Sequence, residues 1–147
     1  DQIHETIEKV RASGIHVIAN FIFGLPGETR ETMEATLNLA TDLNTPFANF
    51  YGTSAYPGSP LYAEPLTHRP QDLPPSWSGY AQLAADFTPL RTDALTSAEI
   101  VAFRDRAFRD YHSSDRYTSM IRKTFGEVGV AEVQRMLSRF IKRDAHQ

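Results

Sequence analysis

Residues 20–29 read NFIFGLPGET, an apolar run that passes into a glycine- and proline-containing turn. The run from His16 to Phe23 is apolar, β-branched or aromatic at nearly every position, which predicts a strand buried on both faces. Gly24 and Gly27 permit positive φ angles in the turn. Thr29 is placed to cap a helix that begins at the next residue. The stretch therefore predicts a strand, a tight turn and a helix in direct succession.

The flanking sequence predicts a second unit of the same kind. Helical periodicity covers about Gln2 to Ser13 before the strand and Arg30 to Leu43 after the turn. A second strand is predicted for Phe47 to Ala55. Helix, strand, helix and strand with short connections are typical of parallel βα units, so we predict an α/β fold. Because two such strands alone leave their outer edges exposed to pairing, we also predict poor autonomous stability.

The second half of the chain predicts an irregular segment followed by helices. Six prolines between Pro57 and Pro75 favour an ordered but irregular surface segment. Trp77 to Tyr80 predicts a packed loop or a short helical turn. Thr96 and Glu99 fit a capping box, and apolar residues recur at helical spacing from there. Two more helices are predicted on either side of Gly126, at about 115–124 and 130–142.

Composition narrows the function classes. The chain has no cysteine, which excludes a disulfide framework, and no stretch approaches the length of a membrane span, so we expect no membrane partner. Residues 1–100 hold five basic and twelve acidic side chains (−7), whereas residues 101–147 hold ten basic and six acidic ones (+4). The basic residues of the second part alternate with acids on amphipathic helices. A solvated helical face explains them, and we expect no nucleic-acid partner.

The run GLPGET with its flanks resembles the radical S-adenosylmethionine (SAM) superfamily, in particular the subgroup whose members often carry an N-terminal cobalamin-binding domain. The second strand and the run YPGSPLY at 56–62 continue this resemblance. It implies the C-terminal βα units of a partial TIM-type (β/α)6 barrel in residues 1–62. A proline-rich irregular connector in 63–94 and a mainly helical C-terminal region in 95–147 would follow, with weaker similarity.

The superfamily's signature is three closely spaced cysteines that hold a [4Fe-4S] cluster, whose open iron binds SAM. Without cysteine, this chain cannot hold that cluster by itself. Either it is the C-terminal part of a longer protein, or it is a degenerate homologue that has lost the chemistry. We favour the fragment, because the chain opens at Asp1 directly in a helical pattern. The implied partner is the N-terminal part of the same polypeptide, which would hold the cluster and, as a further candidate cofactor, cobalamin.

The resemblance also implies where SAM would lie. The superfamily's fifth-strand motif resembles Gly-x-Ile-x-Gly-x-x-Glu, which aligns Ile22 with its isoleucine and Gly24 with its second glycine. Ile22 would then pack against the adenine of SAM, and the backbone of the turn at Gly24, Leu25 and Pro26 would pass close by. In the same alignment, Asn20 replaces the first glycine of the motif.

Polar residues near the strand ends are the remaining site candidates. The Asn20 amide stands inside an apolar strand and must find hydrogen-bond partners. Two interpretations stay open: a contact with SAM or substrate inside the barrel, or an amide satisfied by neighbouring backbone. After the second strand we expect Tyr56 to face a substrate cavity, in preference to its polar neighbours Tyr51, Thr53 and Ser54.

The resemblance implies that the complete protein is a cytoplasmic enzyme acting on a small-molecule substrate. It would cleave SAM reductively, giving a 5′-deoxyadenosyl radical or a cobalamin-dependent methyl transfer. We assign no catalytic residue and no metal ligand in this chain, and expect the fragment alone to be inactive. The alternative is a non-catalytic binding or regulatory module derived from the same half-barrel. A different α/β-barrel enzyme would need an acid–base or metal constellation, and the five scattered histidines supply none.

Overall fold

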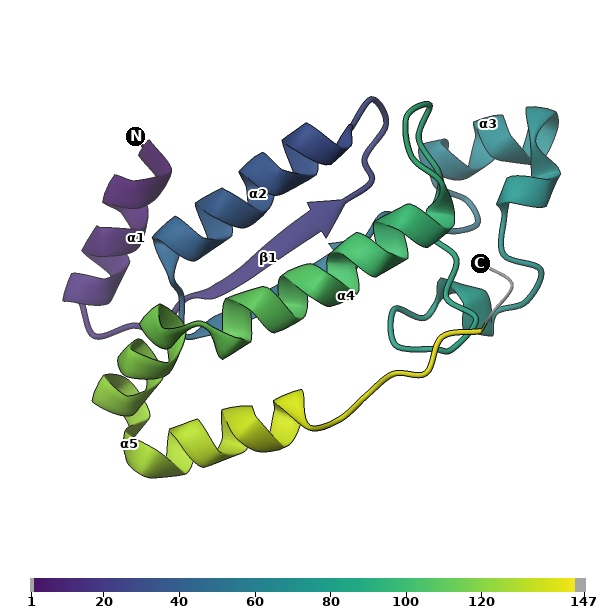
Figure 1. Cartoon of the computed structure of the whole chain (residues 1–147). Helices are drawn as coiled ribbons and strands as arrows, with labels where there is room; N and C mark the ends of the chain where they lie inside the picture. The colour runs from purple at the N-terminus through teal and green to yellow at the C-terminus, as the bar shows by residue number, and fades with distance from the viewer. Residues whose placement is uncertain (1, 145–147) are drawn as a thin grey trace.

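The computed structural model describes residues 2–144 as a mixed α/β fold with a two-stranded parallel sheet (Figure 1). This confirms the predicted α/β class, while the partial (β/α)6 barrel stays a prediction. In chain order the elements are α1 (Gln2–Ala12), β1 (Ile18–Phe23), α2 (Arg30–Leu43), β2 (Phe47–Gly52), α3 (Pro60–His68), the 3₁₀ turns η1 (Pro70–Asp72) and η2 (Ser78–Tyr80), α4 (Ser97–Ser113) and α5 (Asp115–Leu137).

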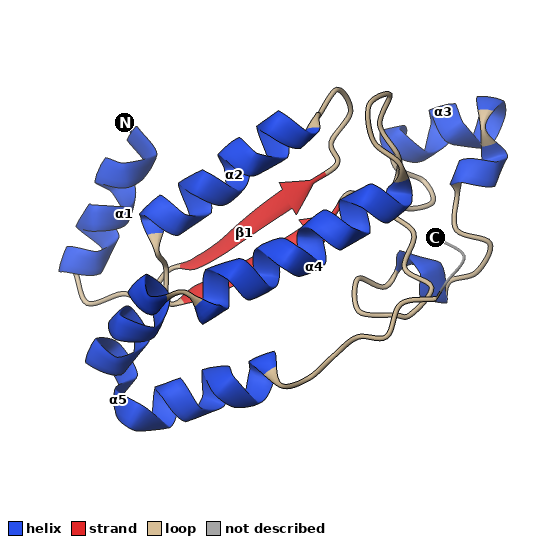
Figure 2. Cartoon of the chain, in the orientation of Figure 1, coloured by secondary structure: helices blue, strands red, loops and turns tan. Residues whose placement is uncertain are grey.

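Strands β1 and β2 pair in parallel, with Ile18 opposite Phe47 and Phe23 opposite Gly52. Helices α2 and α4 lie on the same side of this sheet, as Figure 2 shows. Side chains on that side are buried, whereas those of Ile18 and Phe47, on the other side, are exposed. The prediction that the first strand is buried on both faces is therefore wrong, because residues 2–144 supply helices for one face only.

One hydrophobic core joins the predicted half-barrel to the predicted C-terminal helical region. Phe23 of β1 and Phe50 of β2 stack with ring centroids 6.0 Å apart, and Phe103 of α4 meets Phe23 edge-on at 5.0 Å. Met33 of α2 and Ile100 of α4 are fully buried in the same core. Full burial of such a side chain stabilises the fold by about 1.5–3 kcal/mol relative to its exposure. The C-terminal helices thus pack against the buried face of the sheet.

The two outer edges of the sheet differ in whether their backbone groups have partners within residues 2–144. Thr53 N–H donates to Phe23 O at 2.9 Å, so Phe23 directs its backbone groups at the neighbouring strand segment. Backbone direction alternates along a parallel strand, so Asn20 and Ile22 direct theirs at the opposite edge of β1, where residues 2–144 place no strand. We expected both outer edges to be exposed. The edge of β2 is instead occupied by side chains, which are described with the site below.

The predicted helices of the first half are present. α1 is followed by Gly14 in the left-handed region (φ +75°), and α2 spans the predicted residues, with Met33 and Leu37 on its buried face. α3, however, lies where we predicted an irregular proline-rich segment. Pro60 occupies its first turn, where a missing backbone N–H removes no helical hydrogen bond, so proline permits the helix there.

Helices are also present in the C-terminal part of the chain as predicted, with altered bounds. Thr96 and Glu99 form the expected capping box of α4. α5 continues through Gly126, whose φ of +69° and ψ of −167° kink it, and ends at Leu137, so the predicted helix to 142 is too long. After α5 the chain runs back below α4 towards the loops that follow α3 (Figure 1). We call residues 138–144 the C-terminal strap; residues 1 and 145–147 lie outside the described range.

Candidate functional site

Hydrogen bonds between its own residues hold the turn after β1 in shape. The Glu28 carboxylate accepts the Leu25 N–H at 2.8 Å, and the Glu28 N–H donates to the Leu25 carbonyl at 2.9 Å. Thr92 Oγ1 donates to the Glu28 carbonyl at 3.0 Å and ties the turn to the segment that precedes α4. Leu25 is itself exposed. The turn therefore holds a defined shape at the carboxyl end of β1.

Gly24 is required by the fold as well as by the predicted site. Its φ is +80°, in the region that side chains rarely adopt. A Cβ at this position would lie 2.7 Å from Ile100 Cδ1 of α4. The glycine thus lets α4 approach the strand end closely. Whether SAM also passes Gly24 and Pro26 stays a prediction.

The open face of the sheet brings Asn20 and Ile22 together. In the parallel register Asn20 is opposite Asn49, and Ile22 is opposite Tyr51. Asn49 Nδ2 donates to Asn20 Oδ1 at 3.0 Å, so the Asn20 amide finds a side-chain partner. The Ile22 side chain is exposed on the same face. An apolar side chain beside a polar amide pair is a surface suited to a ligand with an aromatic ring and polar substituents.

The residues after β2 separate into structural and exposed positions. Thr53 Oγ1 donates to the Phe23 carbonyl at 3.0 Å and is buried, and Ser54 Oγ accepts from Gln82 Nε2 at 3.3 Å. Tyr56, the residue we favoured, is 51% exposed. Its ring stacks on that of Tyr80. Tyr56 is therefore available for contact, and its role in a substrate cavity stays a prediction.

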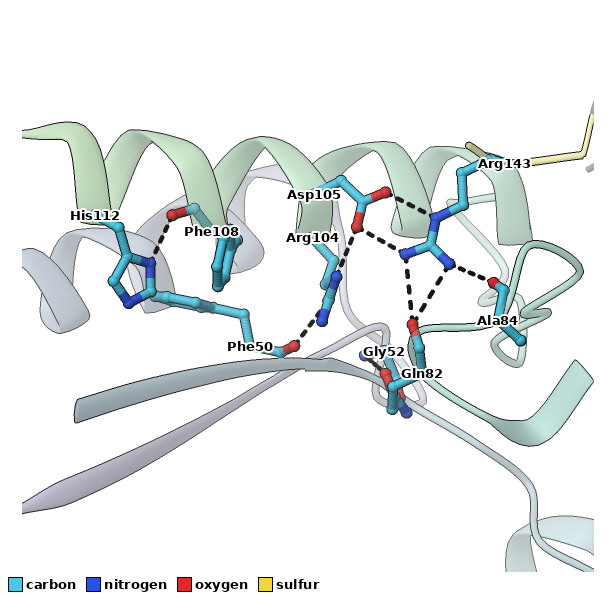
Figure 3. A network of polar contacts seen from close by, with 9 residues as sticks. All are labelled: Phe50, Gly52, Gln82, Ala84, Arg104, Asp105, Phe108, His112 and Arg143. Atoms are coloured by element: carbon cyan, nitrogen blue, oxygen red, sulfur yellow. Dashed lines mark hydrogen bonds and ion pairs between the residues drawn. The ribbon is translucent and has the colours of Figure 1, made fainter. Parts of the chain in front are cut away.

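A polar network closes the outer edge of β2 (Figure 3). The Gln82 side-chain amide accepts from Gly52 N–H and donates to Gly52 O, both at 2.9 Å, as a neighbouring strand would. Arg104 Nε donates to the Phe50 carbonyl at 2.8 Å. These three backbone groups of Gly52 and Phe50 point away from β1. These contacts satisfy the groups that would otherwise recruit a further strand.

The network extends from Arg104 to the C-terminal strap. Arg104 Nη1 contacts Asp105 Oδ1 at 2.7 Å, and Arg143 clamps the same carboxylate through Nη2 at 2.8 Å and Nε at 2.9 Å. Burial raises the pKa of Asp105, but the hydrogen bonds from Arg143 and Arg104 outweigh it and hold that pKa below its usual range. Arg143 Nη1 also donates to the Ala84 carbonyl at 2.7 Å. Arg143 thereby joins the strap to the loop that carries Gln82.

Sequence reasoning missed this network, although one signal was present. Arg104 occupies a position four residues after Ile100 on the helical face that also carries buried Ala107 and Tyr111. A charged residue within such an apolar stripe requires partners. The partners, in β2 and in the C-terminal strap, are distant in sequence and do not follow from that pattern.

His112 is the buried histidine of α4 and has a structural environment. Its Nδ1 lies 2.8 Å from the Phe108 carbonyl, and its ring packs against Phe108, Tyr111 and Tyr117. Burial lowers the pKa of His112, opposed by the hydrogen bond to the Phe108 carbonyl. Among residues 2–144, no group of three or more histidine, cysteine, aspartate or glutamate side chains is placed to hold a metal ion. His146 lies outside the described range.

An apolar cavity of about 570 Å³ lies at the other end of the sheet, near the start of β2. Phe47 and Phe125 line it, together with Tyr117, Ile121 and residues of the part of α5 that follows the kink at Gly126. Phe125 also packs its ring against His16 at 5.1 Å. Function in parallel α/β folds gathers at the carboxyl ends of strands, so this cavity is separate from the candidate site. No helix within residues 2–144 is long and apolar enough to cross a membrane.

Comparison with known proteins gives partial matches. The chain is 36% identical over 58 residues to an uncharacterized methyltransferase of Pyrococcus horikoshii, covering 40% of this chain and 13% of that protein. It is 43% identical over 54 residues to the tRNA-2-methylthio-N(6)-dimethylallyladenosine synthase of Actinobacillus succinogenes, covering 37% and 11%. It is 38% identical over 64 residues to the anaerobic magnesium-protoporphyrin IX monomethyl ester cyclase of Rubrivivax gelatinosus, covering 44% and 12%. No protein-family model matches the chain.

These matches support a relationship to the radical SAM superfamily. The matched region spans only 11–13% of the length of these three relatives. Sequence comparison therefore supports a segment related to radical SAM enzymes, and the structure shows this segment as an α/β fold with a two-stranded parallel sheet. The relatives differ in the reactions that their names describe, so the matches select no substrate.

Proposed function

We propose that this chain is the C-terminal part of a radical SAM enzyme and forms the adenine-side wall of its SAM chamber. The observation that carries this proposal is the uncovered face of the β1–β2 sheet. Asn20 and Ile22, for which the resemblance implies a position near SAM, stand side by side there, and helices of residues 2–144 cover only the opposite face. In a closed or partial barrel the helices lie outside and the uncovered face becomes the interior.

The open edge of β1 supports the same proposal. Backbone groups of Asn20 and Ile22 point towards that edge, while Gln82 and Arg104 close the edge of β2. The sheet can therefore extend on the β1 side and not on the β2 side. We infer that the preceding strands of a partial (β/α)6 barrel pair with β1, which makes β2 the last strand and the preceding polypeptide the partner of this chain.

The chain's own residues suit SAM and do not suit the cluster. Ile22 offers an apolar surface for a ring, and the Asn20 amide offers polar atoms beside it. The chain has no cysteine, so cluster ligands would come from the preceding polypeptide. When bound, the [4Fe-4S] cluster supplies the electron that cleaves SAM. We place the enzyme in the cytoplasm, since such a cluster needs reducing surroundings.

The proposal also includes a candidate reaction, methyl transfer, and a candidate cofactor, cobalamin. The methyltransferase of Pyrococcus horikoshii supports methyl transfer as a candidate reaction by its name alone. The two other relatives are named for a methylthio modification of a tRNA nucleoside and for a cyclisation of a tetrapyrrole ester. We propose a small-molecule substrate, and cobalamin as a candidate cofactor of a preceding domain.

The test begins with the coding sequence upstream of Asp1. We expect three closely spaced cysteine codons and, after anaerobic expression, about four irons per chain with visible absorption typical of an iron–sulfur cluster. SAM binding by equilibrium dialysis completes the measurement. An initiator codon directly before Asp1, with no bound iron and no SAM binding, would leave the alternative, a non-catalytic binding or regulatory module.

A further inference from the structure

Three aromatic side chains form an exposed cluster beyond the carboxyl end of β2. Tyr56 follows that strand, and Trp77 and Tyr80 belong to the loop around η2. The Tyr56 and Tyr80 ring centroids are 5.9 Å apart with an interplanar angle of 28°, and the Trp77 and Tyr80 centroids are also 5.9 Å apart. We call these three residues the aromatic shelf.

The shelf presents ring surface to solvent. Trp77 is 78% exposed, although the short helical turn predicted for this segment is present as η2, and Tyr56 is half exposed. Tyr80, between them, is partly buried. Burying an aromatic side chain is among the largest favourable contributions to a fold, so an indole held outward leaves that contribution available to a ligand.

Side-chain hydrogen bonds and close packing hold the loop that carries Trp77 in its conformation. Asp86 Oδ2 accepts hydrogen bonds from Ser76 Oγ at 2.9 Å and Ser78 Oγ at 2.5 Å, so one carboxylate oxygen binds the residues on both sides of Trp77. These hydrogen bonds lower the pKa of Asp86, that from Ser78 most. A Cβ on Gly79 would lie 2.6 Å from Pro74 Cβ, which shows how closely this loop packs. The exposure of Trp77 is thus a property of an ordered turn.

The shelf is also fixed relative to the candidate site. Gln82, two residues after Tyr80, pairs its side-chain amide with both backbone groups of Gly52. Tyr56 Oη donates to the Tyr80 carbonyl at 3.4 Å. Both contacts join the loop to the carboxyl end of β2, the end at which the proposed SAM chamber opens.

We propose that the aromatic shelf binds a flat conjugated ring of the substrate by stacking. Its three side chains are aromatic and offer polarisable ring faces, which attract other ring faces without selecting a charge. The nearby acid, Asp86, already accepts two hydroxyl hydrogen bonds at one oxygen. A macrocyclic ring and a nucleobase share this chemistry. Describing the ring as part of a substrate rests on the proposed function; the stacking site itself does not.

Trp77 provides a direct readout, because it is the only tryptophan of the chain. We would titrate the complete polypeptide with a water-soluble porphyrin, with N6-dimethylallyladenosine and with cyclohexanecarboxylate. The difference in emission between wild type and Trp77→Phe isolates Trp77 from any tryptophan elsewhere. We expect one flat probe to quench Trp77 and the saturated probe to have no effect; which flat probe binds distinguishes macrocycle from nucleobase.

Variants test whether the shelf itself binds the ring. Trp77→Ala should weaken binding about 5- to 100-fold, the range that stacking on an aromatic side chain contributes. Trp77→Phe should retain most of the affinity. Leu83→Ala is the matched control, because Leu83 is 67% exposed on the same loop but lines a different hollow with Phe140 and Arg104. Its affinity should equal that of wild type.

Three results would overturn the proposal: no binding of either flat probe, equal affinity of wild type and Trp77→Ala, or a Trp77 emission already shielded from acrylamide without probe. The last would mean that other parts of the polypeptide cover the shelf. SAM binding, measured by dialysis in the same variants, separates the two proposals. Loss of ring binding in Trp77→Ala by a polypeptide that binds no SAM would uphold the shelf and contradict the radical SAM function.

Discussion

Asn49 and Asn20 face each other on the open side of the sheet, with Asn49 Nδ2 donating to Asn20 Oδ1 at 3.0 Å. Neither of our two sequence interpretations of Asn20 described this partner. The bond uses one of the polar atoms of each amide, so further donors and acceptors remain for a ligand. The pair therefore orients Asn20 without excluding a contact with SAM.

Asn20→Ala should weaken SAM binding with little effect on stability. Loss of one neutral hydrogen bond reduces affinity by about 2- to 10-fold. The free energy of unfolding of this chain should change by less than about 0.5 kcal/mol, since the pair is exposed. Equilibrium dialysis of the complete polypeptide and denaturant unfolding of the chain make the two measurements. Asn49→Ala is the control: an equal loss of affinity in both variants would show that the pair, and not Asn20 alone, contacts SAM.

Gly24→Ala should destabilise the chain more than Gly27→Ala. Both glycines have positive φ (+80° and +83°), but only Gly24 lies against another element, since a Cβ added there would stand 2.7 Å from Ile100 Cδ1. We expect a loss of about 1 kcal/mol for Gly27→Ala and about 2–4 kcal/mol for Gly24→Ala, measured by urea unfolding. Equal losses would show that Ile100 moves aside without cost.

Gln82→Ala should open the outer edge of β2. The Gly52 N–H and carbonyl would lose their partners, which lowers the free energy of unfolding by about 1–3 kcal/mol. The Gly52 amide should exchange faster with deuterium, and the chain should aggregate more readily, because an exposed edge recruits other strands. Gln71→Ala, at an exposed glutamine, is the control. An unchanged exchange rate at Gly52 would contradict the edge-closing role.

Arg143→Ala should release the C-terminal strap. The guanidinium group clamps Asp105 with two contacts below 3 Å and also donates to the Ala84 carbonyl. We expect a loss of about 1–3 kcal/mol and faster tryptic cleavage at Arg139. Arg135→Ala removes an exposed ion pair with Glu132 and should change stability by less than about 0.5 kcal/mol. Similar effects of the two variants would mean that the clamp adds nothing beyond a surface pair.

His112 should make stability fall between pH 7 and pH 5. Burial lowers the pKa of His112 in the folded chain, so the unfolded chain, with an ordinary histidine pKa near 6.5, binds its proton first as the pH drops. The free energy of unfolding therefore includes the contribution of neutral His112 above about pH 6.5. It loses that contribution as the pH falls further, by at most about 1.4 kcal/mol per pH unit. His112→Gln should flatten this dependence in urea titrations. Because the other histidines remain in that variant, an unchanged slope would assign the effect to them.

Local pattern predicted the elements whose residues specify their own conformation. The periodicity of Met33 and Leu37 gave α2 its bounds, and the capping box of Thr96 and Glu99 gave the start of α4. Both signals involve residues within one or two turns of each other. The same reasoning failed at α3, where proline composition outweighed the favourable place of Pro60 in the first turn. It also extended α5 past Leu137, since the apolar residue Phe140 continued the stripe but is 80% exposed.

The α/β class, the strand–turn–helix unit at residues 20–29 and the resemblance that points to SAM all follow from residues that are neighbours in the chain. The open sheet face, the closed edge of β2 and the need for glycine at position 24 became clear from the folded arrangement. Those features arise where Ile100, Gln82 and Arg143 meet segments far from them in the chain. Such contacts follow from packing in three dimensions, which no local pattern encodes.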